Sequence, residues 1–171
     1  MLIWEYPTTD AAVVRRDAAG CAADAEPFLR DDGKGSLVVC AHDGAKPAGT
    51  PVEKKLQVLF TGGHYGREGG EWLFYVGLWT PDDFRDEFLG WYKMEHLPIL
   101  LECPLWDGCR FVEQQVEKGC QFYALHQMSD KAALDSAERM HSRSTPWFKR
   151  LSTNGWFDGA FTRTLCRRLS A

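Results

Sequence analysis

The sequence predicts an α+β fold whose C-terminal part runs βαββαβ, the element order of a ferredoxin-like unit. Three observations support this prediction. An apolar, β-rich run at Trp72–Trp79 leads into a long amphipathic helix, two strand-like runs follow as a hairpin, and a second capped helix precedes a last strand-like run. The 171 residues, 44% hydrophobic and 13% aromatic, suffice for one large core or two small ones.

The first residues of the chain parallel part of this unit. Leu2–Tyr6 has a strand pattern, Thr8-Thr9-Asp10 has the composition of a helix cap, and Leu37–Cys40 has a second strand pattern. With a helix expected over residues 11–25, the order matches the back half, βαβ, of a ferredoxin-like unit. We therefore expect a partial second repeat at the N terminus, the alternative being an unrelated extension.

A linking segment separates the two parts. Residues 43–51 are rich in Gly, Pro and Ala, Leu56–Phe60 has a strand pattern, and residues 62–70 form a glycine-rich loop by composition. The predicted regions are therefore a ferredoxin-like half-repeat over 1–42, a linker with one strand and a Gly-rich loop over 43–70, and a complete unit over 71–171.

The long helix after the first strand of the complete unit has clear start signals. Thr80 is the expected N-cap and Pro81 fits the first helical position. Asp82 and Asp83 suit the positive end of the helix dipole. We expect this helix to run to about Leu101.

This helix carries a carboxylate on its apolar face. Glu95 falls within the stripe, and His96 lies at its edge. Because Pro98 has no N–H, the carbonyl of Met94 loses its usual partner, so the helix should bend or loosen around Glu95 and His96. The apolar members of the stripe are Phe84, Phe88, Trp91, Tyr92 and Ile99.

The remaining elements complete the predicted unit. Cys109–Val116 and Gly119–Met128 should pair as a hairpin, and a helix capped by Ser129 and Asp130 should extend from Lys131 to about Arg143. A break at residues 144–147 and a turn at 154–155 precede a last strand over Phe161–Leu169. The residues expected to face the core from the second helix are Ala133, Leu134, Ala137 and Met140.

Composition argues against several classes of partner. The chain has 20 Lys and Arg against 24 Asp and Glu, a net charge of -4, so we expect no nucleic-acid partner. No apolar run approaches the roughly 20 residues needed to cross a bilayer, and the first residues lack a signal-peptide pattern. We therefore expect a cytoplasmic protein without a membrane partner. The six cysteines form no CxxC pair, so we expect reduced, buried thiols.

Glu95 and His96 are the first candidates for chemistry. A carboxylate on an apolar stripe is costly unless it is paired or functional, and the adjacent His96 titrates near neutral pH when unperturbed. The structural alternatives are a salt bridge from Glu95 across a dimer interface and a sheet-edge role for His96.

The segment around these residues resembles a known family. The pattern WYxxEHxPxLL, from Trp91 to Leu101, together with the later Thr145-Pro146-Trp147 step and the hairpin, is similar to the dimeric α/β-barrel superfamily, with EthD-like proteins and methylmuconolactone isomerases as the nearest relatives. The resemblance covers residues 71–169. It implies a four-stranded antiparallel sheet with two helices on one face, and two such sheets meeting in a barrel. It also implies a homodimer and a pocket for a hydrophobic small molecule, where the helix histidine is functional. The N-terminal half-repeat leaves open a pseudo-dimer within one chain.

Other residues are candidates for substrate contact. His126 shares a strand face with Phe122 and Ala124, so it could polarise a substrate oxygen or simply be satisfied by backbone. Large aromatics wall many pockets, although they are more often plain core. Adjacent helix residues point about 100° apart, so Glu95, His96 and His126 should not converge on a metal ion. The substrate-binding candidates are Tyr92, Trp91, Trp106, Tyr123, Trp147 and Arg110.

The sequence thus predicts a cofactor-independent enzyme that acts by proton transfer on a hydrophobic aromatic or polyketide-like small molecule. The reaction would be that of an isomerase, cyclase, lyase or cofactor-free monooxygenase, since fold alone does not choose among these. His96 is the expected acid or base, Glu95 its partner, and Tyr92 and His126 hold the developing oxyanion. The alternatives are a non-catalytic small-molecule-binding or structural barrel, and a haem-handling protein.

Overall fold

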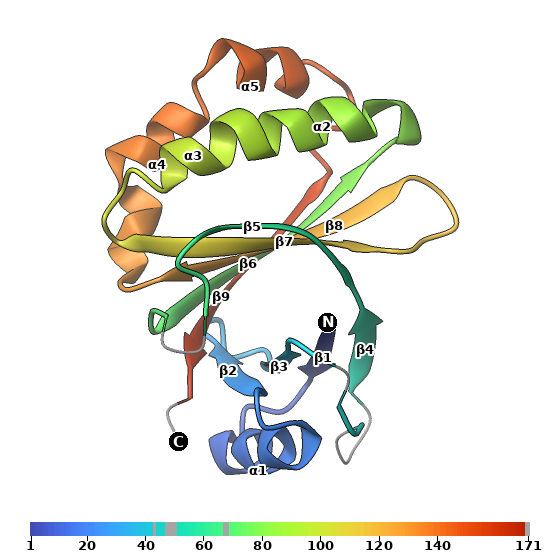
Figure 1. Ribbon diagram of the computed structural model, residues 1–171, viewed down its shortest axis with the longest axis vertical. Helices are drawn as coiled ribbons and strands as arrows, with labels where there is room; N and C mark the ends of the chain where they lie inside the picture. The colour runs from blue at the N-terminus through green and yellow to red at the C-terminus, as the bar shows by residue number, and fades with distance from the viewer. Residues whose placement is uncertain (43, 47–50, 67–68, 170–171) are drawn as a thin grey trace.

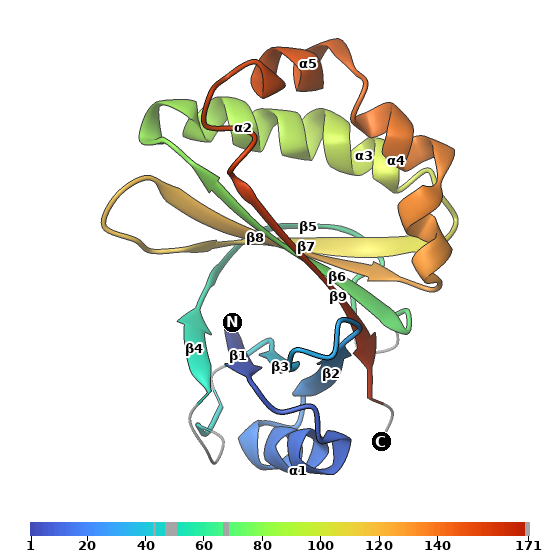
Figure 2. The same ribbon diagram turned by 180° about the vertical axis from the view of Figure 1, so that it is seen from behind.

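The computed structural model describes residues 1–42, 44–46, 51–66 and 69–169. One nine-stranded antiparallel sheet curls into a barrel, with α1 below it and the other helices above it (Figures 1 and 2). The strands are β1 (Leu2–Tyr6), β2 (Glu26–Arg30), β3 (Ser36–Cys40), β4 (Val52–Lys55), β5 (Gln57–Gly63), β6 (Trp72–Thr80), β7 (Trp106–Gln114), β8 (Cys120–Met128) and β9 (Phe161–Arg168). The α-helices are α1 (Ala11–Cys21), α2 (Arg85–Trp91), α3 (Leu97–Leu100), α4 (Ala137–Ser142) and α5 (Pro146–Ser152).

The C-terminal part is the predicted ferredoxin-like unit. Its strands lie in the order β9-β6-β8-β7, and its helices cover one face of the sheet (Figure 1). The packed layer between helices and sheet contains buried side chains from both, such as Phe88 from α2 and Phe122 from β8. The α+β, ferredoxin-like fold class is therefore confirmed.

The N-terminal part differs from the predicted βαβ back half. Glu26–Arg30, to which we assigned no structure, is strand β2, so the chain runs βαββ and continues into β4. The strand order β4-β1-β3-β2 repeats that of the C-terminal unit. The described residues between β3 and β4 contain no second helix. The strand was not predicted because a proline inside a short run argues against a strand. In the structure, Pro27 lies within β2, opposite Val38 of β3.

The barrel closes within the single chain. Strands β2 and β9 pair across one junction, with Leu29 opposite Arg167. At the other junction, β4 pairs with β1 and β5 pairs with β7, although β4 and β5 are separated only by Leu56. The Leu56 amide donates to the Met1 carbonyl at 3.0 Å. The barrel itself needs no second chain, so the homodimer stays a prediction. The buried residues inside the barrel are Ile3, Phe28, Leu37, Val39, Leu56, Leu73, Tyr75, Val112, Tyr123, Leu125 and Cys166.

The long helix begins one residue later than predicted and is irregular where predicted. Thr80 is the last residue of β6, paired with Cys120, so Pro81 takes the N-cap position of a 3₁₀ turn, Asp82–Phe84, that leads into α2. The irregularity expected from Pro98 is confirmed as a π-helical segment, Tyr92–His96, between α2 and α3. Tyr92 and His96 lie at its two ends.

The segment predicted as one helix over residues 131–143 is two short helices, and a third, α5, follows it. A 3₁₀ helix, Lys131–Asp135, ends at Ser136, whose side chain then caps α4 by accepting from the Arg139 amide at 3.2 Å. Met140 is 66% exposed, contrary to its predicted place in the core. The predicted break is the start of α5, where the Thr145 hydroxyl accepts from the Phe148 amide at 3.1 Å. Across the described ranges, no helix is long and apolar enough to cross a membrane.

Candidate functional site

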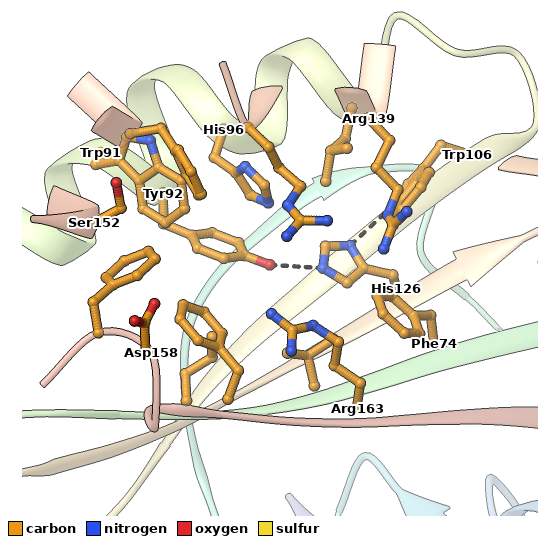
Figure 3. A pocket seen from close by; sticks show the side chains of 17 residues that line it. Phe74, Trp91, Tyr92, His96, Trp106, His126, Arg139, Ser152, Asp158 and Arg163 are labelled. Carbon is orange, nitrogen blue, oxygen red and sulfur yellow. Dashed lines mark hydrogen bonds between the residues drawn. The ribbon is translucent and has the colours of Figure 1, made fainter. Parts of the chain in front are cut away.

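A cavity of about 440 Å³ lies between the helices and the sheet of the C-terminal unit. Seven of its 17 lining residues are Phe, Trp or Tyr, and polar groups gather around two histidines (Figure 3). Strands β6, β7, β8 and β9 supply the floor, while the helices from α2 to α5 and the segment before β9 supply the rest. The lining residues are Phe74, Val76, Leu78, Trp91, Tyr92, His96, Leu100, Trp106, His126, Arg139, Arg143, Phe148, Ser152, Phe157, Asp158, Phe161 and Arg163.

A buried chain of hydrogen bonds crosses the floor of the cavity. The Tyr92 hydroxyl lies 2.6 Å from Nε2 of His126, and the Trp106 indole N–H donates to Nδ1 of His126 at 3.0 Å (Figure 3). His126 is 2% exposed and stands on β8, opposite Phe74 of β6 and Cys109 of β7. Each ring nitrogen of His126 therefore has one partner.

This chain fixes the protonation of all three side chains. An indole N–H can only donate, so Nδ1 of His126 must accept and the imidazole proton resides on Nε2. Burial lowers the pKa of His126 well below its usual value, with His96 and Arg139 adding to the effect, so the ring stays neutral. Nε2–H then donates to the Tyr92 oxygen. Burial raises the pKa of Tyr92, so the phenol keeps its own hydrogen and can donate it to a ligand.

His96 is the second imidazole of the cavity. Its ring lies 4.6 Å from the Trp91 ring and 4.9 Å from the Tyr92 ring, measured between centroids. Its pKa is lowered to about 3, first by burial and then by the charges of Arg143 and Arg139, against a raising effect of the Ser142 backbone. Nδ1 is buried and has no hydrogen-bond partner among the described residues. Nε2 is therefore the nitrogen through which His96 can exchange a proton with a ligand.

Three arginines also line the cavity, and the sequence analysis assigned none of them. Arg139 lies on α4, Arg143 is its C-cap residue, and Arg163 lies on β9. Burial lowers the pKa of Arg139 and of Arg163, and the charge of Arg143 lowers both further. A signal was present in the sequence: positions 139 and 143 share a helix face, and Arg163 alternates with Phe161 on one face of a strand.

Five predicted site residues meet in this cavity. The helix supplies three of them because Tyr92 and His96 are four residues apart and so face the same way, with Trp91 beside them. Strand β8 supplies His126 and strand β7 supplies Trp106. The structure thus brings together His96, His126, Tyr92, Trp91 and Trp106.

Glu95 lies outside the cavity, which corrects its predicted partnership with His96. Its carboxylate accepts a hydrogen bond from the Thr145 hydroxyl at 2.6 Å, and Thr145 caps α5. The Glu95 carboxylate is engaged by Thr145 and is not among the groups that line the cavity with His96. The carboxylate on the apolar stripe therefore anchors α5 to the long helix.

Three further candidates also lie elsewhere. Tyr123 faces the barrel interior, stacked on Tyr75 at 5.3 Å, because successive strand residues point to opposite faces. The guanidinium of Arg110 lies over the Tyr65 ring at 4.5 Å. Trp147 packs against Gly90 of α2, outside the cavity lining. In the part of the chain that the structure describes, no three His, Cys, Asp or Glu side chains are grouped to hold a metal ion.

Comparisons with known proteins show the fold. No family model and no curated protein matches the sequence. A ferredoxin-fold protein related to antibiotic biosynthesis monooxygenases from Listeria monocytogenes is similar in structure, with a TM-score of 0.66 and 14% identity over 99% of this chain and 95% of that one. A haem-degrading enzyme of the same species has a TM-score of 0.61 and 13% identity over 98% of this chain and 99% of that one. An anthrone oxidase-like protein has a TM-score of 0.65 and 10% identity over 99% and 90%.

Proposed function

We propose that the protein is a cofactor-independent enzyme that transfers a proton on a flat, hydrophobic, aromatic or polyketide-like molecule in this cavity. The observation that carries the proposal is the Trp106–His126–Tyr92 chain. It leaves one phenol hydrogen of Tyr92 without a protein acceptor in the described structure, at the floor of an aromatic cavity. A fixed donor on the wall of such a cavity is suited to hold a developing oxyanion.

The first chemical step follows from the positions of His96 and Tyr92. Nε2 of His96 takes a proton from a substrate carbon that lies next to a carbonyl group or is conjugated with one through an aromatic ring. The electron pair of the broken C–H bond moves to the substrate oxygen, which becomes an enolate or phenolate. Tyr92 donates a hydrogen bond to that oxygen. This step is shared by isomerisation, cyclisation, elimination and cofactor-free oxygenation.

Proton exchange tests this step directly. Anthrone has acidic methylene protons that are conjugated with its ketone through the two flanking aromatic rings, and the protein should speed their replacement by deuterium in deuterated water. Tyr92→Phe should slow the exchange by about 10²–10³-fold, the usual effect of losing one oxyanion donor. His96→Ala should abolish it. Tyr123→Phe is the matched control, because it removes the same hydroxyl from the barrel side of the sheet.

The control should exchange at the wild-type rate. The enzymatic proposal would be overturned if the wild-type protein exchanged the protons of anthrone, a naphthol and an aryl lactone no faster than buffer alone. A thermal shift with the same compounds would then favour a non-catalytic binding protein. The finer resemblance to EthD-like proteins and methylmuconolactone isomerases stays a prediction.

Haem handling is the rival with a specific observation behind it. His96 offers a nitrogen to the cavity, whereas both nitrogens of His126 are engaged. One structural neighbour is described as a haem-degrading enzyme. A Soret band that appears with added haemin and disappears in His96→Ala would favour this rival, and an unchanged haemin spectrum would remove it.

A further inference from the structure

The three cavity arginines form no ion pair among the described residues, although the charge of Asp135 acts on Arg139 from a longer distance. Within the residues that the structure describes, Arg139, Arg143 and Arg163 have no carboxylate oxygen within 4.0 Å. Figure 3 shows the Arg139 and Arg163 side chains reaching into the cavity beside His126. Asp158 also lines the cavity but forms no ion pair with them.

Most of the other arginines in the described part of the chain form ion pairs, whereas Arg110 lies over the Tyr65 ring. The described ion pairs include Arg30–Asp32 at 2.6 Å, Arg85–Glu113 at 2.9 Å, Arg150–Glu87 at 2.8 Å, Arg167–Glu71 at 2.6 Å and Arg168–Glu26 at 2.7 Å. The chain as a whole carries four more acidic than basic residues, so acidic side chains are not scarce. Three neighbouring cations around an aromatic cavity repel one another. A cluster that carries this cost is the arrangement expected where an anion binds.

We propose that the substrate of this cavity is an aromatic carboxylate, with its carboxylate held by Arg139, Arg143 and Arg163. This proposal rests on the proposed function and narrows its substrate class. The guanidinium fork matches a carboxylate with two parallel hydrogen bonds, which makes arginine the suitable cation here. The aromatic wall would hold the ring system, for which Phe74 and Phe161 already lie beside Arg139 and Arg163 at 5.9 and 4.9 Å.

The bound carboxylate would also change the base. The charges of Arg143 and Arg139 hold down the pKa of His96 in the free protein. A carboxylate that neutralises them removes this effect and raises the pKa of His96, so the base becomes stronger only when the substrate is present. The titratable and charged groups that face His96 across the cavity are Tyr92, His126, Arg139, Arg143, Asp158 and Arg163.

Binding of a matched pair of probes tests the proposal without any turnover. Anthraquinone carboxylate and its methyl ester have the same ring system and differ in charge. The wild-type protein should bind the acid more tightly, by calorimetry, and the preference should shrink as salt is added. Arg139→Met and Arg163→Met should each weaken binding of the acid by about tenfold or more, and leave the ester unchanged. Arg150→Met is the matched control, because Arg150 is exposed and paired with Glu87.

A second readout is the pKa of His96, followed by NMR of its imidazole nitrogens. It should rise when anthraquinone carboxylate is added and stay unchanged with the ester. Near-UV circular dichroism checks that each variant is folded.

The proposal would be overturned by equal affinity for the acid and the ester, or by no binding of either probe. It would also be overturned if the preference for the acid survived in both Arg139→Met and Arg163→Met. These outcomes are separate from the anthrone exchange. If the wild-type protein does not exchange the anthrone protons but still binds the acid more tightly than the ester, the proposed enzyme is overturned and the anion site remains.

Discussion

Replacing Trp106 by Phe tests the hydrogen-bond chain on which the site depends. The change removes the indole N–H that donates to Nδ1 of His126 at 3.0 Å and keeps an aromatic ring in place. In the wild type, a proton on Nδ1 would face the indole N–H and lose this bond. The neutral form with the proton on Nε2 is therefore favoured by about 1–3 kcal/mol, or roughly five- to 150-fold.

In Trp106→Phe this preference disappears, because neither form of His126 finds a partner for Nδ1. Both neutral forms should then be populated, and in one of them Tyr92 turns its hydrogen toward Nε2 and away from the cavity. The orphaned, buried Nδ1 should also lower the free energy of unfolding by about 1–3 kcal/mol. Trp147→Phe is the control, because Nε1 of Trp147 has no hydrogen-bond partner among the described residues.

NMR of the imidazole nitrogens reports the tautomer, and urea unfolding reports the stability. The wild-type spectrum should show Nε2 protonated and Nδ1 unprotonated. His126 should stay neutral as the pH is lowered from about 7 to about 5, whereas an unperturbed histidine titrates near 6.5. A wild-type His126 that carries its proton on Nδ1, or that titrates near that value, would refute the reasoning. Equal losses of stability in the two tryptophan variants would refute it as well.

Three further predictions concern stability, each measured by urea unfolding. The pKa of His126 is lower in the folded than in the unfolded chain, so the unfolded chain binds the extra proton. This residue should therefore lower the free energy of unfolding by about 2 kcal/mol as the pH drops from about 7 to about 5. His126→Gln should lack that part of the loss, and an equal dependence of stability on pH in both proteins would contradict the prediction. Thr145→Ala removes the cap of α5 and the donor to Glu95, and should cost about 1–2 kcal/mol, whereas Thr145→Ser should cost little. Leu56→Ala empties a buried position at the closure of the barrel and should cost about 2–4 kcal/mol, against a negligible effect for the 60% exposed Val52→Ala.

Local patterns in the sequence were enough for most of the fold. Alternation of residue types identified β6 and β8, and the missing N–H of Pro98 located the irregular turn at Tyr92–His96. Local rules failed where tertiary pairing decided the outcome. Threonine is a common helix-capping residue, but Thr80 pairs with Cys120 and belongs to β6. β2 forms despite its proline because it pairs with two neighbouring strands, β3 and β9.

The candidate site was predictable only in part, for a related reason. Residues on one helix face or one strand face share a direction, which placed Tyr92, His96 and His126 on the same side of the sheet. Which side chains from other elements join them depends on how the helices cross the sheet. Arg139 and Arg163 come from such elements, 24 positions apart in the sequence, and only the folded chain shows them around one cavity.

The continuous run from β4 through Leu56 to β5 has a thermodynamic consequence. In a barrel assembled from two chains, dilution separates the halves and the melting temperature depends on protein concentration. Here the halves are tethered, so each experiences the other at an effective concentration in about the millimolar range or above, whatever the amount of protein. The tether also removes the need for symmetry. Among the described residues, the C-terminal half carries several helices and the cavity, whereas the N-terminal half carries α1 alone on its sheet.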